Sequence, residues 1–453
     1  MGRITLEQAA QWCGGQVADK YKNVTFLGAN NDTRKLQEGQ LFVALQGARD
    51  GHDFIPAAME KGAAAVLCTH CDGDFPAIVV PDTRIALGDI ARQERLRIGM
   101  HVVGVTGSVG KSTTKEMIAA VLQSTYRVSK TPVNHNNDIG MPMAILSMPE
   151  DTQIAVLEMG MNHFREIAYL TAIAKPDVAV IVNIGTMHIE HLGSKEGILQ
   201  AKLEIMEGME PGKPIILNGD DELLWNLRNR PEINGVYFGV QNDKSHICAQ
   251  NVKEEYQKIS FTVTRGASSY EVELPLVGQH FVLDALAAIS VGIQFDVSEE
   301  NIRNSLEMFQ NMEGRQQIFE AKGFTIIQDC YNAGPESMAA ALAVLGNRSG
   351  RKIAVLGDML ELGSCATSEH YKVGRLAAEK ADMVFAYGPH SLKVKDGALT
   401  GGMAPVCARA FTDADILAQV LRQTAKPGDV FLFKGSRGMR MECVLEKFLQ
   451  EEN

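Results

Sequence analysis

The chain has 453 residues, of which 45% are hydrophobic and 22% charged, a composition typical of folded globular proteins rather than disordered or fibrous ones. At roughly 150 residues per domain, this length predicts about three domains. The formal charge of −11 argues against broad nucleic-acid binding, and since neither a signal peptide nor an apolar run of roughly 20 residues that could cross a bilayer is visible, we expect a cytoplasmic protein.

The first 97 residues have a mixed pattern of short helices and strands, which predicts a small mixed α/β domain. Cys68 and Cys71 form the one close pair among eight cysteines, and no second Cys or His pair stands at zinc spacing. We therefore expect these two residues to be reduced thiols rather than metal ligands.

From about residue 98, short apolar runs alternate with longer segments of helical period, a pattern typical of a parallel sheet flanked by helices. Strands are expected at 101–106, 154–157, 178–182 and 214–217, and a helix over 111–123. The stretch 235–275, rich in Val, Thr, Tyr and Phe, predicts antiparallel strands appended to this domain. Residues 98–313 are thus expected to form a central domain of the P-loop ATPase type.

After Gly314 the alternation of strands and helices begins again. Strands near 324–328, 352–356, 383–387 and 430–433 predict a second α/β domain, Rossmann-like, over residues 314–453. The expected fold class is therefore α/β, in three domains.

A glycine-rich loop follows the first strand of the central domain. Glycines let backbone N–H groups surround phosphate oxygens, and the helix that begins near Lys111 adds its positive end. Five residues separate Gly104 from Gly110, one more than in the common form of this motif, but the loop still predicts phosphate binding, with Lys111 reaching the β- and γ-phosphates and Ser112 reaching Mg²⁺. The expected contacts are Thr106, Gly107, Ser108, Val109, Gly110, Lys111, Ser112 and Thr113.

The next two strands end at Glu158 and shortly before His188, so a carboxylate and an imidazole are expected at the same edge of the sheet. Both can bind Mg²⁺, the imidazole less typically; the alternatives are a helix cap for Glu158 and an ordinary loop residue for His188. The amide-rich run with Asn134, Asn136 and Asn137 suits phosphate or a substrate carboxylate, although a capped turn is equally consistent with it. Lys202 alone would be interpreted as a surface charge.

These residues resemble those of the Mur ligases, which build the peptide stem of bacterial cell-wall precursors, and the resemblance runs nearly end to end. It implies ATP and Mg²⁺ as cofactors and a CO₂-derived carbamate on Lys202, which would turn a cation into a carboxylate-like group. The catalytic residues implied are Lys111, Lys202, His188 and Glu158, and the metal-binding ones Ser112, Glu158, His188 and Lys202.

The motifs of the terminal domains resemble particular members of that family. Those near the N-terminus resemble the domain that grips a UDP-sugar, which implies substrate contacts from Asp32, Thr33, Arg34, Gly47, Asp50 and His52. Those near the C-terminus resemble the D-alanyl-D-alanine-adding members, and the Asp-Asn-Pro-Arg motif of diaminopimelate-adding ligases is absent. They imply nucleotide contacts from His280, Arg315, Asp329 and Tyr331 and substrate contacts from Asn332, Lys434 and Arg437; alone, Arg315, Lys434 and Arg437 could equally be surface charges.

The sequence departs from the family pattern at three places. Phe281 and Asp284 stand where the family has asparagines around adenine, and Cys330 and Gly334 replace residues that are commonly acidic or Asn. Adenine recognition is therefore expected to differ in detail.

The resemblance implies a carboxylate–amine ligase that releases ADP and phosphate and joins D-alanyl-D-alanine to UDP-N-acetylmuramoyl-tripeptide through an acyl phosphate. We expect a monomer with no nucleic-acid partner. The alternatives are another Mur-type or folylpolyglutamate-type ligase and, from a different class, a P-loop switch or assembly ATPase.

Overall fold

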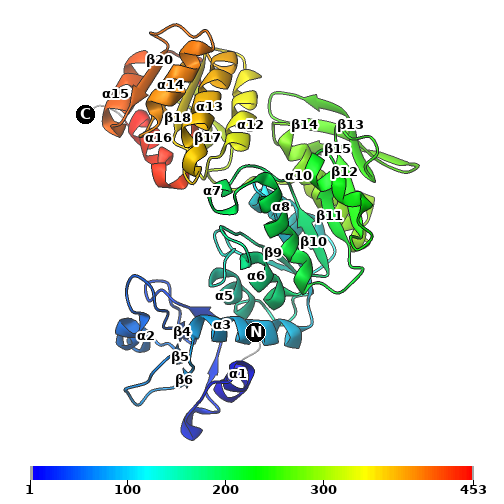
Figure 1. Cartoon of the computed structure of the whole chain (residues 1–453), viewed down its shortest axis with the longest axis vertical. Helices are drawn as coiled ribbons and strands as arrows, with labels where there is room; N and C mark the ends of the chain where they lie inside the picture. The colour runs from blue at the N-terminus through cyan, green and yellow to red at the C-terminus, as the bar shows by residue number, and fades with distance from the viewer. Residues whose placement is uncertain (1–3, 451–453) are drawn as a thin grey trace.

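The computed structural model describes residues 4–450. The first three residues of the predicted N-terminal domain and the last three of the predicted C-terminal domain therefore lie outside it. Three separate groups of strands follow one another along the chain, and each is covered by its own helices (Figure 1). The predicted α/β fold class is confirmed. No helix between residues 4 and 450 is long and apolar enough to cross a membrane.

The N-terminal part holds a four-stranded parallel sheet in the order β3-β4-β5-β6 and a separate antiparallel pair, β1-β2. Helix α3 connects this part to the rest: it begins after Asp82, whose carboxylate accepts N–H bonds from its first turn, and it ends at Gly99. Residue 97 thus lies in the last turn of α3. The bounds are β1 (Ile4–Thr5), α1 (Leu6–Cys13), β2 (Thr25–Phe26), β3 (Ala29–Asn30), β4 (Leu41–Val43), α2 (Ile55–Glu60), β5 (Ala65–Cys68), β6 (Ala77–Val79) and α3 (Thr83–Ile98).

The central sheet has nine strands in the order β15-β14-β13-β12-β11-β10-β7-β9-β8. Its middle strands are buried on both faces: Val103 and Val105 of β7 pack with α4 and α10, whereas Val102 packs with α3 and α6. The strands are β7 (His101–Thr106), β8 (Val128–Lys130), β9 (Ile154–Glu158), β10 (Val178–Ile181), β11 (Ile215–Asn218), β12 (Gly235–Gly239), β13 (Ile247–Glu254), β14 (Ile259–Arg265) and β15 (Ser268–Leu274). The helices are α4 (Lys111–Gln123), α5 (Gly140–Leu146), α6 (Glu166–Ala174), α7 (Ile189–Leu192), α8 (Lys195–Leu203), α9 (Glu222–Trp225), α10 (His280–Gln294) and α11 (Glu299–Glu307).

The predicted strands and helix of this part are confirmed to within about a residue. The expectation of antiparallel strands over 235–275 was wrong for its first part, because β12 pairs in parallel with both β11 and β13, and only β13, β14 and β15 pair antiparallel. The connection from β11 to β12 runs through α9, and a crossover of this kind joins parallel strands.

The C-terminal sheet has the order β16-β17-β21-β18-β19-β20, and every pair except β16-β17 is parallel. The four predicted strands are confirmed, whereas the edge strands β16 and β20 were not foreseen. The bounds are β16 (Gln317–Ala321), β17 (Phe324–Asp329), α12 (Pro335–Gly346), β18 (Lys352–Gly357), α13 (Ala366–Lys380), β19 (Met383–Tyr387), α14 (Ser391–Thr400), β20 (Ala408–Phe411), α15 (Ala414–Thr424), β21 (Val430–Lys434) and α16 (Met441–Leu449).

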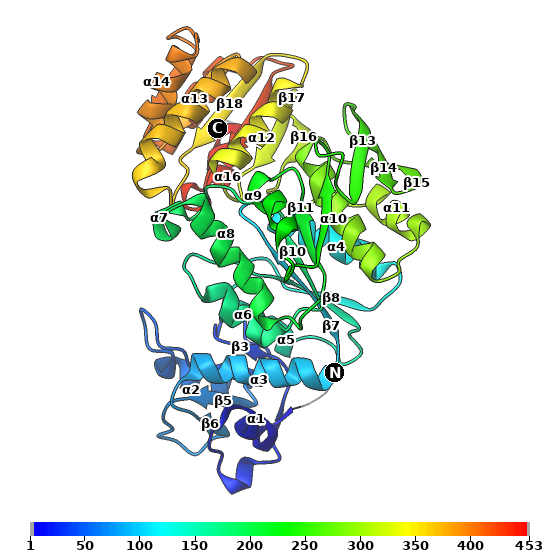
Figure 2. The same cartoon turned by 45° about the vertical axis from the view of Figure 1, so that its right-hand side comes forward.

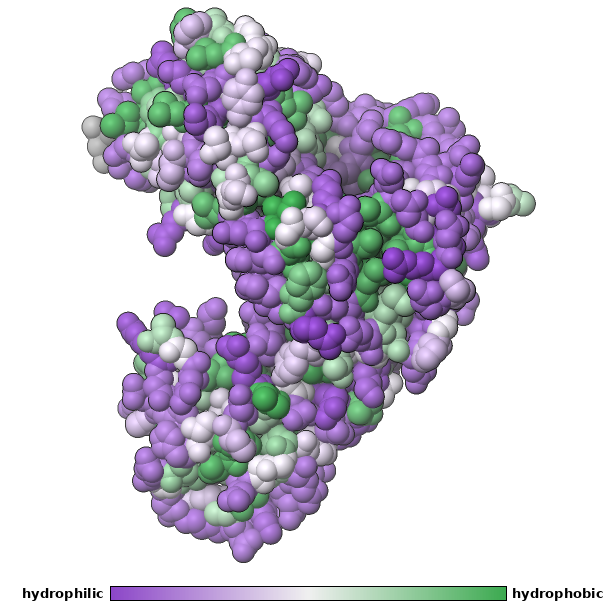
Figure 3. Space-filling model, in the orientation of Figure 1, coloured by the Kyte–Doolittle hydropathy of each residue, from purple (hydrophilic) through white to green (hydrophobic). Residues whose placement is uncertain are grey.

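Helix α12 touches the central part at both of its ends. At its start, Glu336 accepts hydrogen bonds from Thr186. Just after its end, Arg348 donates to the carbonyl of Tyr256, in the turn between β13 and β14, and its guanidinium lies 5.2 Å from the centre of the Tyr256 ring. Figure 2 shows the C-terminal part above α7 and α8, and Figure 3 shows the surface hollowed between it and the N-terminal part.

Candidate active site

The glycine-rich loop lies where expected, between β7 and α4. Gly110 has φ +85°, a conformation that favours glycine, and a Cβ added there would lie 2.9 Å from a carboxylate oxygen of Asp284. The N–H groups of Gly110, Lys111, Ser112 and Thr113 have no acceptor among residues 4–450. Four unpaired donors at the positive end of a helix form a site for an anion such as phosphate.

Asn183, which the sequence interpretation did not single out, holds the first part of this loop. Its side-chain oxygen accepts the N–H groups of Ser108 and Val109 at 3.1 and 2.9 Å, and its side-chain nitrogen donates to the Val109 carbonyl at 2.9 Å. The amides of Ser108 and Val109 are therefore engaged by protein, and the anion-binding donors are those from Gly110 onward.

The Lys111 ammonium curls over the same loop and donates to the carbonyls of Gly107 and Ser108 at 2.8 and 3.2 Å. Burial and the nearby positive charge of Arg315 lower the pKa of Lys111, against the opposite effect of Glu158. An anion at the loop would stabilise the charged form of this lysine.

Glu158 ends β9 and is buried, which excludes the helix-cap interpretation. Its carboxylate accepts a hydrogen bond from Asn136 at 3.0 Å and lies 3.8 Å from the ammonium of Lys115. Burial opposes ionisation of Glu158, but the charges of Lys111 and Lys115 outweigh it, so the pKa is lowered and the carboxylate is charged. Fully buried Lys115 was missed by sequence reasoning, because a lysine on a helix normally indicates a solvated face.

His188 lies in the left-handed backbone region, with φ +63°, just before α7. Its Nδ1 is buried, makes no hydrogen bond within residues 4–450, and lies 3.1 Å from a carboxylate oxygen of Glu361 in the C-terminal part. Burial, together with the charges of Lys111 and Lys202, lowers the pKa of His188 to about 4. The imidazole is thus neutral at physiological pH and has a lone pair available to a metal.

Lys202 lies on α8 and is 2% exposed, so the surface-charge interpretation was wrong. Among the described residues its ammonium has no hydrogen-bond or ion-pair partner. Burial, with a smaller contribution from the charge of Lys111, lowers the pKa of Lys202 well below its usual value. A neutral amine with a free lone pair is a nucleophile.

A cavity of about 480 Å³ lies between the central and C-terminal sheets. Of the predicted site residues, it is lined by Ser108, Val109, Gly110, Lys111, Ser112, Thr113, Asn134, Asn136, Asn137, Glu158, His188, His280, Arg315, Asp329, Tyr331, Asn332 and Lys434. The others stand outside its wall: Thr106, Gly107, Lys202, Arg437 and the six residues of the N-terminal part.

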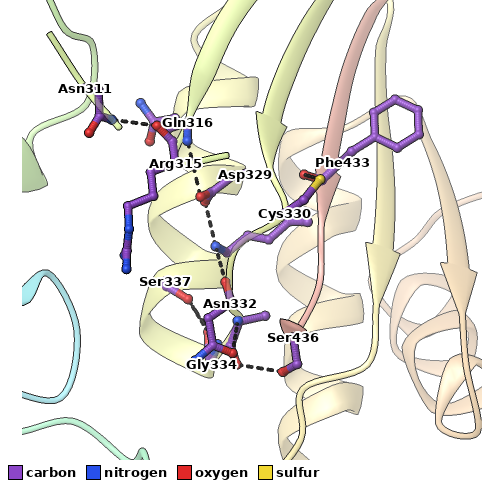
Figure 4. A network of polar contacts seen from close by, with 12 residues as sticks. Asn311, Arg315, Gln316, Asp329, Cys330, Asn332, Gly334, Ser337, Phe433 and Ser436 are labelled. Atoms are coloured by element: carbon purple, nitrogen blue, oxygen red, sulfur yellow. Dashed lines mark hydrogen bonds and ion pairs between the residues drawn. The ribbon is translucent and has the colours of Figure 1, made fainter. Parts of the chain in front are cut away.

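The C-terminal wall is held by a polar network (Figure 4). Lys434, 2% exposed, donates to Asp329 at 2.6 Å and to the Asn332 carbonyl at 3.0 Å, which ties the ends of β17 and β21 together. The alternative of a surface charge is thus excluded for Lys434, whereas the Arg437 side chain is 68% exposed and pairs with Glu442.

Arg315 links this wall to the phosphate loop. Its guanidinium donates to the Ser112 hydroxyl at 2.9 Å and lies 4.0 Å from the centre of the Tyr331 ring. Tyr331 in turn hydrogen-bonds Asn134 of the central part. The two walls of the cavity are therefore joined by charge-assisted and aromatic contacts directly over the loop.

His280 and Asp284 occupy the cavity end of α10. Burial lowers the pKa of His280 to about 4 and raises the pKa of Asp284 to about 7, although Thr114 donates a hydrogen bond to Asp284 at 2.7 Å. Near neutral pH, a protonated Asp284 offers one donor and one acceptor, as the amide of an asparagine does.

The N-terminal motifs lie apart from this cavity, at the carboxyl edge of the four-stranded sheet. Asp32, Thr33 and Arg34 follow β3, with Asp32 bonded to the Arg34 guanidinium at 2.8 and 2.9 Å. Gly47, Asp50 and His52 follow β4, and His52 bridges Asp50 and the Thr69 N–H group. Both motifs thus lie where a parallel sheet binds ligands.

The cysteines are free thiols, as expected for Cys68 and Cys71. Between residues 4 and 450 no three His, Cys, Asp or Glu side chains converge as a metal cluster.

Three family models match successive parts of the chain. They are described as "Mur ligase family, catalytic domain" over residues 23–95, "Mur ligase middle domain" over 105–292, and "Mur ligase, glutamate ligase domain" over 314–437.

Two curated relatives match nearly the whole chain, and both are named UDP-N-acetylmuramoyl-tripeptide–D-alanyl-D-alanine ligase. The protein from Bacillus subtilis is 39% identical and 99% of each chain is covered; that from Escherichia coli is 34% identical, with 99% of this chain and 98% of the relative covered.

Solved structures agree with this likeness. MurF from Acinetobacter baumannii superposes with a TM-score of 0.91 at 31% identity, with both chains fully covered. MurF ligase from Thermotoga maritima, solved in complex with ADP, has a TM-score of 0.82 at 30% identity and covers 93% of this chain and 97% of its own.

Proposed function

This chain belongs to the Mur ligase family, and we propose that it joins D-alanyl-D-alanine to UDP-N-acetylmuramoyl-tripeptide with ATP, a step of peptidoglycan precursor synthesis. The observation that carries the proposal is the juxtaposition of the phosphate loop with the residues from Asp329 to Asn332 across one cavity. The names of the relatives from Bacillus subtilis and Escherichia coli support the substrate pair.

In the proposed reaction, the tripeptide carboxylate attacks the γ-phosphorus of ATP in line and ADP leaves. The free amine of the dipeptide then attacks the acyl phosphate, and phosphate leaves as the amide forms. The four unpaired N–H groups from Gly110 to Thr113 and the Lys111 ammonium would bind and orient the phosphate oxygens, reducing the repulsion between two anionic reactants.

The residues beside the loop fit a magnesium ion. Glu158 is a charged carboxylate, Ser112 offers a hydroxyl oxygen, and the buried Nδ1 of His188 has no hydrogen bond within the described chain. We propose these three as its ligands, and when bound the ion would supply positive charge to the β- and γ-phosphates.

Lys202 fits the proposed carbamate. Burial favours its neutral amine, which can attack CO₂ and lose a proton, giving an N-carboxylate. Lys111 and Lys115 interact with Glu158, and Lys202 interacts with Lys111 and His188, so a negative group on Lys202 would offset the positive charge near the proposed metal position.

We further propose that the chain forms three domains bounded near residues 97 and 313. The N-terminal domain would bind the UDP-sugar through Asp32, Thr33, Arg34, Gly47, Asp50 and His52. We also propose that the protein acts as a monomer in the cytoplasm, where ATP is available. The C-terminal domain would bind the dipeptide near Asn332. Lys434 would act there by holding Asp329 and the Asn332 carbonyl.

The test is phosphate release from ATP with UDP-muramoyl-tripeptide and a panel of acceptors, leaving out one component at a time. We expect release only when ATP, the tripeptide and D-alanyl-D-alanine are all present. Release without the dipeptide would instead indicate a switch or assembly ATPase, and equal release with single amino acids would indicate a different ligase.

A further inference from the structure

The segment that carries His188 makes backbone hydrogen bonds to three different parts of the molecule in succession. The N–H of Ile184 donates to Asp221 of the central part at 2.7 Å, that of Gly185 to the hydroxyl of Ser108 in the phosphate loop at 2.9 Å, and that of Thr186 to Glu336 of α12 at 2.9 Å. Three consecutive amides thus connect the central sheet, the phosphate loop and the C-terminal part.

The contact with Glu336 is closely fitted on both sides. The Thr186 hydroxyl lies 3.1 and 3.2 Å from the two carboxylate oxygens of Glu336, in addition to the N–H bond. A Cβ added to Gly185 would lie 2.9 Å from the carboxyl carbon, so only a glycine lets the carboxylate approach this closely. Two hydrogen bonds to an ionised acceptor are stronger than two between neutral groups.

The contact between Glu336 and Thr186 can affect the phosphate site because Thr186 lies close in the chain to residues of that site. Thr186 precedes His188 by two residues, and Gly185, next to it, bonds the loop residue Ser108. His188 holds a backbone conformation that non-glycine residues rarely adopt, which requires the surrounding contacts to maintain it. Glu361, another residue of the C-terminal part, lies 3.1 Å from the His188 ring.

We infer that Glu336 is a positioning residue: by binding Thr186 when the C-terminal part is docked, it fixes the segment 184–188 and completes the phosphate site. The acceptor-binding part and the phosphate site would then be coupled, so that phosphoryl transfer is fast only when both are in place. The kinetic test of this inference rests on the proposed ligase reaction, whereas the hydrogen-exchange test does not.

The first test compares Glu336→Ala and Glu336→Gln in the full chain, with Glu300→Ala as the matched control. Glu300 occupies the same second position of a helix, α11, and is exposed, so it controls for loss of a carboxylate in a first helical turn. For Glu336→Ala we expect kcat to fall about 10- to 100-fold, the range for a lost charge-assisted hydrogen bond, with each KM changed less than about two-fold. Glu336→Gln keeps an oxygen that can accept the Thr186 N–H bond and should lose less.

The second test follows hydrogen exchange of the amides of residues 184–188 in the same full-length variants. Faster exchange in Glu336→Ala, and unchanged exchange in Glu300→Ala, is expected. Thr186→Val, which keeps the backbone N–H and the side-chain shape, should reduce kcat less than Glu336→Ala, and combining it with Glu336→Gln should give less than the product of the two separate losses.

An unchanged kcat for Glu336→Ala would overturn the inference, as would a raised KM at unchanged kcat, which would mean that Glu336 binds substrate directly. Unchanged exchange at 184–188 would overturn it too. If the unmodified chain released no phosphate with all three substrates, the proposed function would fail while the exchange result still decided the role of Glu336.

Discussion

Buried lysines are the unusual feature of this site at the level of single residues. Lys115 and Lys202 are 0 and 2% exposed, yet within residues 4–450 only Lys115 has carboxylate partners, at 3.2 Å from Glu116 and 3.8 Å from Glu158. A buried lysine is costly when charged, so burial lowers the pKa of Lys202 well below its usual value and favours the neutral amine. That state is the one that can react with CO₂.

Replacing Lys202 by Ala is expected to lower the rate of phosphate release about 10²- to 10³-fold, the loss typical of removing one electrostatic contribution to a transition state. The exposed Lys195→Ala on the same helix is the control and should keep its rate. The rate is measured with all three substrates, and the carbamate is sought by ¹³C NMR after equilibration with ¹³CO₂. An unchanged rate would remove the carbamate from the mechanism. So would the absence of any carbamate signal that is present in the unmodified chain and lost in Lys202→Ala.

Residues that belong to motifs could be placed at the cavity from the sequence, whereas residues that act through their position in the fold could not. Lys111, Ser112 and Glu158 follow strands of one sheet, so their meeting could be predicted. Asn183, Lys115 and Glu336 could not, because their roles depend on which side chain faces them across the fold. The glycine at 185 was a signal of close approach, but the sequence does not name the partner that approaches.

Helices α4 and α10 pack against each other on one face of the central sheet, and Asp284 is the polar contact between them. Burial raises the pKa of Asp284 from a usual value of 3.8 to about 7, so the folded state binds more protons than the unfolded state between these values. The contribution of this carboxyl to stability is therefore present below about pH 4 and is lost as the pH rises through 7.

Asp284→Asn is expected to raise the melting temperature at about pH 8, by an amount that shrinks at about pH 5, where the aspartic acid is protonated. Each unit of raised pKa corresponds to about 1.4 kcal/mol at most. The measurement is thermal unfolding between those pH values, with exposed Asp243→Asn as the control. A gain that did not depend on pH would show that Asp284 is not protonated in the folded protein.

The strands that were predicted correctly are those buried on both faces, because a short run of apolar residues between turn signals marks them clearly. Edge strands β16 and β20 carry polar residues such as Gln317, Glu320 and Arg409. Their sequences therefore cannot be distinguished from those of loops. The sequence pattern also does not predict the direction of a strand. Strand β12 has the same kind of residues as its neighbours, and its parallel pairing depends on the path of the connecting chain.

At the scale of the whole molecule, the proposed UDP-sugar residues and the cavity lie on different parts, with the surface hollowed between the N- and C-terminal parts (Figure 3). A reaction that joins three substrates requires their reacting atoms to come together. We therefore expect the radius of gyration to decrease when an ATP analogue, the tripeptide substrate and the dipeptide are all bound.

Small-angle scattering measures this change, with the ATP analogue alone as the control. A smaller decrease with the analogue alone than with all ligands would agree with closure driven by the substrates. An unchanged radius of gyration in the full complex would contradict the need for closure.

The two contacts of α12 have a mechanical consequence. With 12 residues, this helix is about 18 Å long, and it is supported at one end by Tyr256 and at the other by Thr186. A rigid helix held at both ends cannot rotate, but if the Thr186 contact opened while the Tyr256 contact held, the Glu336 end, beside the phosphate site, would move furthest. The turn between β13 and β14, remote from the chemistry, would thereby set how far the two walls of the cavity part and how accurately they return.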